Sequence, residues 1–452
     1  MRNAFKTGLL AGLAAAALLA VPSLAVAQEL DAGENFISLG HIVVPGSPLQ
    51  SFDISWVDKD LNLYLLADRS NVSIDVIPII VNPPVFKITG GFAGNVPAAA
   101  CGGQANICSG PNGILTLNNP NNAAGKELWV GDGPTNNPVC GGNGLVCSTV
   151  KVFNTLAVVT HTINTGGSFL ADELCFAPPN AAAGQPNGLI LIANDADAPP
   201  FVSFIPTDGP NAYQVIRKVS YTQATNGIEQ CQFDPGTGLF YLNLPEVNGP
   251  GDDSAPGQVR LLSAATLSDV GFFNVDHTQC AGPQGMAIGP RPGNDILLGC
   301  FAVSTPSGTQ NSVIISNLNG GIFQTLGGQG GADQVWFEDI AGQHYFLPNG
   351  NLLSPSAHQQ LGITDAVTRV QDQNIFVGFT GATTRRVHSL AAWSGSPIGL
   401  GTSVTAVWMP VPQIGGGTPG FTSPLCGSDA LLGCIAVFGA VPIPTNAAEA
   451  VN

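Results

Sequence analysis

The feature that most constrains this 452-residue chain is a unit of short strands that repeats along it. Residues 52–77 read FDISWVDKDLNLYLLADRSNVSIDVI, which predicts three strands separated by polar turns. A short apolar strand that opens such a unit returns every 49 to 61 residues. The predicted opening strands are 52–57, 113–118, 173–178, 229–235, 284–290, 333–339 and 388–393.

Four-stranded units at this period are typical of a β-propeller, an all-β fold whose blades surround a central channel. Seven blades fit the repeat best, six are the alternative because the last unit is irregular, and a β-sandwich with appended domains is the other alternative. Residues 36–44, FISLGHIVV, stand where a fourth strand belongs. We therefore expect an N-terminal strand to complete the last blade and close the ring, within one domain over residues 28–452.

The N-terminus carries the features of an export signal. Arg2 and Lys6 precede an apolar run over 8–21, and Ala25-Val26-Ala27 matches a signal-peptidase cleavage pattern. These features predict a signal peptide over residues 1–27, with the mature chain starting at Gln28. A retained anchor is the alternative, but the run is shorter than the ~20 residues that span a bilayer. We expect a soluble periplasmic or extracellular protein that does not insert into the membrane.

The charge balance narrows the choice of partners. The chain has 14 basic and 30 acidic side chains, a formal net charge of −16, which disfavours nucleic acid and anionic membranes. An acidic surface suits a positively charged ligand, or it serves solubility alone. The sequence has no dinucleotide fingerprint, P-loop or haem-attachment motif, so we expect no nucleotide, haem or flavin.

The ten cysteines all follow residue 27, which favours disulfides formed in an oxidising compartment. Spacing predicts four local bridges: Cys101–Cys108, Cys140–Cys147, Cys280–Cys300 and Cys426–Cys434. Cys175 and Cys231 each stand two residues after a glutamate on the opening strands of consecutive units. Their equivalent positions allow a disulfide between neighbouring blades, and two reduced thiols are the alternative.

Polar residues recur at two places that should open on one face of the propeller, namely the start of the first strand and the turn after the second. The strand starts offer Asp53, Asn112, Glu173, Glu229, Gln284, Asp333 and His388, and the turns offer Asp68, Arg69, Asp132 and Asp195. Converging carboxylates repel unless they bind a cation, share protons or pair with Arg69. Oxygen ligands suit a divalent cation, calcium foremost. A purely structural role at strand ends is the alternative.

Residues 64–77, YLLADRSNVSIDVI, together with PNGI at 111–114 and PQGMAIG at 283–289, resemble exported bacterial propellers of the SMP-30/gluconolactonase, NHL and YVTN group. The likeness covers about residues 36–400. The lactonase branch implies an axial divalent metal held by Glu, Asn and Asp side chains. Asn112 matches its asparagine, Asp53 falls where its glutamate stands, and Gln284 falls where its aspartate stands. The resemblance thus implies a metal on Asp53, Asn112, Glu173 and Glu229, with Glu173 or Glu229 as the general base.

Two functions of different class follow from these features. The first is an exported, non-catalytic propeller that binds a cation, a small ligand or a protein partner at the acidic mouth of its channel. Its ligand-binding residues would be Asp68, Arg69, Asp132, Asp195, Asp333 and His388. The second is a metal-dependent hydrolase of lactones or esters.

Overall fold

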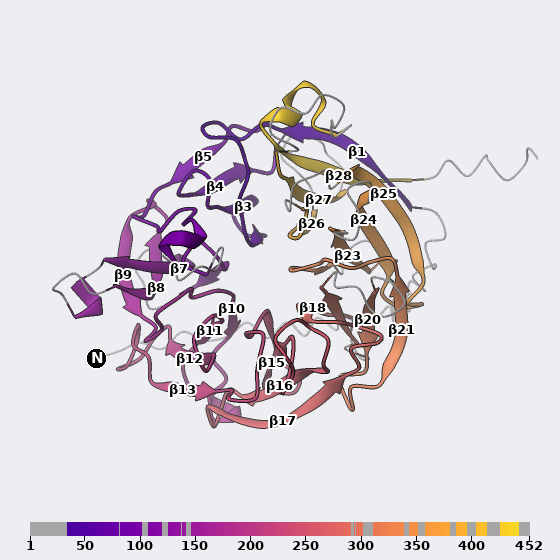
Figure 1. Cartoon of the computed structure of the whole chain (residues 1–452). Coiled ribbons are helices and arrows are strands. Elements are labelled where there is room, and N and C mark those ends of the chain that lie inside the picture. The colour runs from indigo at the N-terminus through magenta and orange to yellow at the C-terminus, as the bar shows by residue number, and fades with distance from the viewer. Residues whose placement is uncertain are drawn as a thin grey trace, which may run out of the picture. The chain divides into compact units, whose positions relative to one another are not determined.

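The computed structural model describes most of the chain after residue 33. The described residues are 34–80, 82–101, 107–119, 125–136, 138–141, 146–290, 293, 295–301, 311–338, 343–350, 358–379, 386–395, 404–413 and 425–442. The predicted signal peptide lies outside this set. Seven four-stranded antiparallel sheets surround a central channel, so the chain is a seven-bladed β-propeller (Figure 1). This result confirms the predicted fold class and rejects six blades and the β-sandwich.

The blades follow one another along the chain, and each one runs from the channel outward. Blade 1 contains β2 (Ser55–Asp58), β3 (Leu63–Asp68), β4 (Ser73–Pro78) and β5 (Phe86–Ile88). Blade 2 contains β6 (Ile114–Asn118), β7 (Lys126–Asn136), β8 (Val146–Asn154) and β9 (Val159–Asn164). Blade 3 contains β10 (Leu174–Ala177), β11 (Leu189–Asn194), β12 (Phe201–Pro206) and β13 (Arg217–Ser220). Blade 4 contains β14 (Cys231–Asp234), β15 (Leu239–Leu244), β16 (Gly257–Ser263) and β17 (Ser268–Val275). Blade 5 contains β18 (Pro283–Ile288), β19 (Ile296–Cys300), β20 (Asn311–Ile315) and β21 (Ile322–Gly327). Blade 6 contains β22 (Trp336–Glu338), β23 (His344–Asn349), β24 (His358–Asp365) and β25 (Gln371–Phe379). Every predicted opening strand is therefore an innermost strand.

The last blade joins the two ends of the described chain. It contains β26 (Ala391–Gly395), β27 (Val404–Val411), β28 (Cys434–Pro442) and, outermost, β1 (Glu34–Ile42). β1 pairs antiparallel with β28 from Glu34 opposite Pro442 to Ile42 opposite Ile435. The predicted closure by an N-terminal strand is confirmed. Phe36 anchors this strand, because its ring is buried against Phe346 and Phe438.

The burial of each strand reflects its place in the blade. The middle strands are nearly continuous apolar runs, and every residue of β11 and β12 is buried, because neighbouring blades cover both faces of each sheet. In the outermost strands, partly buried residues alternate with exposed ones, as in β17. One apolar cluster joins Leu191 and Phe204 of blade 3 to Phe240 and Leu242 of blade 4, and it shows how adjacent blades share a core.

The four predicted local disulfides are present, and no free cysteine occurs among the described residues. Cys175 and Cys231 are bridged with a Cα–Cα distance of 5.8 Å, which fastens β10 to β14 of the next blade. Of the two alternatives for this pair, the disulfide is the one observed. Five disulfides are typical of proteins that fold in an oxidising compartment. No helix in the described ranges has the length and apolar character needed to cross a bilayer.

Glutamine side chains tie the opening strands of different blades together around the channel. Gln230 and Gln232 of blade 4 accept hydrogen bonds from the backbone N–H groups of Met286 and Ile288 in blade 5. Gln334 of blade 6 accepts from Ser55 N at 2.9 Å and donates to Ser55 O at 2.6 Å. These bonds fix the opening strands, and therefore the polar residues that precede them.

Candidate functional site

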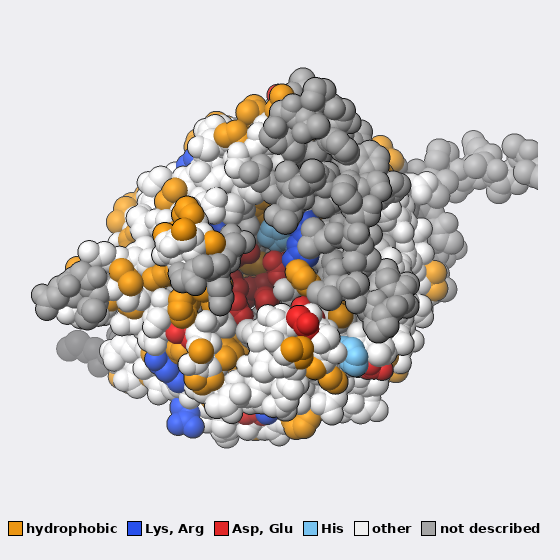
Figure 2. Space-filling model, in the orientation of Figure 1, with side chains coloured by type: hydrophobic (Ala, Val, Ile, Leu, Met, Phe, Trp, Pro, Cys, Tyr) orange, Lys and Arg blue, Asp and Glu red, His pale blue; other side chains and the backbone are white. Residues whose placement is uncertain are grey.

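The polar residues predicted at the strand starts, here called the marker residues, lie just before the innermost strands, except Gln284, which lies within β18. They gather at one mouth of the central channel. Figure 2 shows carboxylate side chains inside the central hollow, with basic side chains beside them. The structure brings eight of the predicted site residues to this mouth: Asp53, Arg69, Asn112, Glu173, Asp195, Glu229, Asp333 and His388. These eight residues converge as predicted, whereas Asp68 and Asp132 do not join them.

Arg69 pairs with the two marker residues nearest to it. Its Nη2 donates to Asp53 Oδ2, and its Nε and Nη2 donate to Asn112 Oδ1 at 3.0 and 2.6 Å. Arg69 and Asp53 are only 7% and 5% exposed. Asn112 also donates from Nδ2 to Ala171 O at 2.9 Å. The guanidinium thus occupies the position between Asp53 and Asn112, and it satisfies both oxygens.

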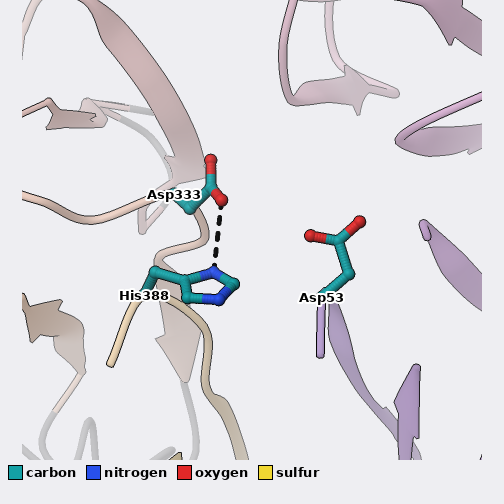
Figure 3. Close-up of side chains that lie close together, drawn as sticks. All are labelled: Asp53, Asp333 and His388. Carbon is teal, nitrogen blue, oxygen red and sulfur yellow. Dashed lines mark ion pairs between the residues drawn. The ribbon is translucent and has the colours of Figure 1, made fainter. Parts of the chain in front are cut away.

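Asp333, His388 and Asp53 form a second group on the same mouth (Figure 3). Asp333 Oδ2 lies 3.2 Å from His388 Nδ1, and the imidazole stacks on Phe52 with ring centroids 4.7 Å apart. The carboxylate of Asp53 faces this pair, and the three residues each offer a ligand atom within 4.8 Å of the others. Burial disfavours the charge of Asp333, but the hydrogen bond and charge of His388, with Arg386 and Arg69, outweigh it and lower its pKa.

Most other carboxyl groups at the mouth have pKa values that are raised, in contrast to that of Asp333. Burial, followed by the repulsion of neighbouring carboxylates, raises the pKa of Asp172, Glu173 and Glu229 well above the usual range. The pKa of Asp53 is also raised by burial, although Arg69 opposes the shift, and its carboxyl group hydrogen-bonds that of Asp172. The mouth therefore holds more carboxyl groups than its basic side chains can pair with, and burial and mutual repulsion favour their protonated forms.

Asp195 gives a testable pH dependence. Burial and the charges of Asp333 and Asp53 raise its pKa to about 7, although the Ile228 N–H, 2.8 Å from Oδ1, opposes the shift. The folded protein holds the Asp195 proton more tightly than the unfolded chain does. The contribution of this proton to stability is therefore complete below about pH 4 and is lost as pH rises towards 7. We expect the free energy of unfolding of Asp195→Asn, relative to that of wild type, to increase by on the order of 2 kcal/mol from pH 5 to pH 8. Urea unfolding at the two pH values measures this difference. A constant difference between the two proteins would contradict this.

A cavity of about 970 Å³ opens beside these groups, over blades 3, 4 and 5. Its charged lining consists of Asp195, Asp197, Glu229 and Asp253. The guanidinium carbon of Arg386 lies 4.3 Å from the ring centroid of Phe301, which also lines the cavity. Its Nη1 has no hydrogen-bond acceptor among the described residues. The cavity is large enough for a small organic ligand, and it is predominantly acidic.

Two predicted ligand-binding residues do not join this group. Asp68 accepts hydrogen bonds from Asn71 and lies 3.3 Å from Lys87 Nζ, and Asp132 pairs with Lys151. Both carboxylates are completely buried within their own blades. Asp172, Asp253 and Arg386 also lie at or beside the mouth but were not predicted from the sequence. Asp172 and Arg386 stand one and two residues before the markers Glu173 and His388, so their position next to a marker was the available signal.

The lactonase resemblance implies a metal ion on Asp53 and Asn112, and the contacts of these two side chains show whether they can hold one. An ion shared by Asp53 and Asn112 would have to take the place of the Arg69 guanidinium, and Asn112 has its side-chain oxygen and nitrogen both engaged. Asp53 and Asn112 do not fit a shared metal ion while Arg69 is paired with both, and we derive no reaction step through one. Metal binding by Asp53, Asn112, Glu173 and Glu229, and the base role of Glu173 or Glu229, stay predictions.

Comparison with known proteins supports the fold. No family model matches the chain, and no curated protein is similar to it in sequence. A structure of streptogramin B lyase aligns over 90% of this chain and 98% of its own, with 8% identity and a TM-score of 0.50. BBS1N, in a crystal structure with ARL6DN soaked with mercury, aligns over 91% of this chain and 98% of its own, with 8% identity and a TM-score of 0.48. The resemblance to the SMP-30/gluconolactonase, NHL and YVTN group is thus supported only as a propeller.

Proposed function

We propose that this protein is an exported, non-catalytic propeller that binds a positively charged small ligand, metal cations included, at the acidic mouth of its channel. The observation that carries the proposal is the convergence of Asp53, Asp172, Glu173, Asp195 and Glu229, whose pKa values are all raised by burial and in part by one another's charge. A bound cation relieves this repulsion, because it stabilises the ionised carboxylates.

The surroundings of these carboxyl groups favour binding over hydrolysis. Arg69 supplies the positive charge where the lactonase resemblance implies a metal, so no observation favours the lactonase or esterase alternative. For a metal cation, the group formed by Asp53, Asp333 and His388 offers converging oxygen and nitrogen atoms. For an organic cation, the 970 Å³ cavity offers Asp195, Asp197, Glu229 and Asp253. Export to the periplasm or the medium is part of the same proposal.

Thermal unfolding at pH 7.5 with added calcium, manganese or spermidine tests the proposal. We expect at least one of these cations to raise the melting temperature by ~3–5 °C at saturation, because binding to the folded state alone stabilises it. The shift should be lost in Glu229→Gln and Asp333→Asn, which remove one charge each from the mouth.

Asp276→Asn is the matched control, because Asp276 is exposed on the outer side of blade 4 and its neutralisation leaves the mouth unchanged. This variant should show the same shift as wild type. The proposal is wrong if none of the three cations stabilises the protein, or if the shift is equal in all variants.

A further inference from the structure

Beyond the charged mouth, the channel has a second, apolar section. A cavity of about 260 Å³ lies between the opening strands β2, β6, β10, β14 and β22. Its wall includes the aromatic side chains Trp56, Phe176, Phe233 and Trp336, together with the disulfide of Cys175 and Cys231. Trp56 and Trp336 contact each other edge to face, with ring centroids 5.6 Å apart. The channel therefore changes from acidic to aromatic along its length.

Glu173 stands where the two sections meet. It directly precedes β10, so it belongs to the mouth, and it also lines the aromatic cavity. The residue is 4% exposed, and the neighbouring carboxyl groups of Asp172 and Asp333 disfavour its ionised form. An ionised carboxyl group that is nearly buried and repelled by other carboxyl groups is destabilising, so a ligand that donates hydrogen bonds and carries positive charge would be favoured at this point.

The cavity offers a metal ion too few ligands. Its amide side chains are Gln230, Gln232 and Gln334, and each of their oxygens already accepts a backbone N–H. Thr116 Oγ1 accepts the Trp56 Nε1–H at 3.0 Å. Hard cations require about six oxygen ligands, whereas aromatic faces attract organic cations and bury their carbon atoms.

We propose that the aromatic section of the channel binds a primary ammonium ion with an apolar body, such as an alkyl- or arylalkylamine. The ammonium group donates to Glu173, and the apolar body packs against Trp56, Trp336, Phe176 and Phe233. This proposal rests on the proposed function, since it names the class of positively charged ligand.

Calorimetric and tryptophan-fluorescence titrations of the whole protein with benzylammonium and n-butylammonium chloride test the inference. We expect saturable binding that changes the emission of Trp56 and Trp336. Benzyl alcohol and benzoate, which keep the ring but lose the positive charge, should bind at least tenfold more weakly.

Glu173→Gln keeps the shape of the protonated side chain and should weaken benzylammonium binding at least tenfold while the protein stays folded. Trp336→Leu should also weaken it, and the exposed-site control Asp276→Asn should not. Binding of neither ammonium ion, or equal binding by wild type and Glu173→Gln, would overturn the inference. Stabilisation by calcium, manganese or spermidine is measured on the same samples, so this inference can fail while the proposed function stands, and loss of both responses would reject both.

Discussion

Replacement of Arg69 with methionine is expected to lower the free energy of unfolding by ~3–5 kcal/mol. Arg69 and Asp53 are almost fully buried, and Arg69 also satisfies Asn112 Oδ1. Its removal leaves an uncompensated carboxylate next to Asp172. Loss of the guanidinium raises the pKa of Asp53 further, so the destabilisation should be larger at pH 8 than at pH 5. Urea unfolding at the two pH values measures both effects.

Two further variants show whether the buried charge is the cause. Asp53→Asn combined with Arg69→Met removes both charges and should recover part of the loss. Arg217→Met, at an exposed position of β13, removes the same charge and should change stability by less than about 0.5 kcal/mol. An Arg69→Met protein as stable as wild type, or equally destabilised at both pH values, would show that Arg69 does not neutralise the mouth.

Removal of the disulfide between blades is the second large effect. Cys175→Ala with Cys231→Ala is expected to destabilise the protein by about 4 kcal/mol, because the bridge closes a loop with a sequence separation of 56. The bond also fastens β10 to β14 beside the channel. The reference is Cys140→Ala with Cys147→Ala, whose separation of 7 predicts a loss of about 2.5 kcal/mol. Equal losses in urea unfolding would contradict a separate contribution from the bond between blades.

The fold was predictable because it depends on local patterns that repeat. Each blade begins with a short apolar strand, and the seven opening strands were located from this pattern and its regular recurrence. The closing strand was predictable because residues 36–44 precede the first unit, at the place where a fourth strand belongs. Equivalent positions also indicated that Cys175 and Cys231 could meet, but the choice between a disulfide and two thiols needed the positions of both strands.

The site was predictable only in part, because its chemistry depends on contacts between distant residues. The repeat identified one polar residue for each blade, yet it gave no sign that Arg69 would pair with Asn112, 43 residues further along the chain. Asp68 and Asp132 follow the pattern equally well, but lysines of their own blades pair with them. The aromatic section was missed because Trp56 and Trp336, which contact each other, are far apart in the sequence.

A calorimetric titration of spermidine and of calcium into the purified protein, at pH 7.5 and at pH 5, tests the central claim most directly. A positively charged ligand at the acidic mouth predicts saturable binding at pH 7.5 that is at least tenfold weaker at pH 5. The weakening follows because protonation of Asp195 and its neighbours neutralises the mouth. The absence of binding at both pH values, or binding that is stronger at pH 5, would contradict the account.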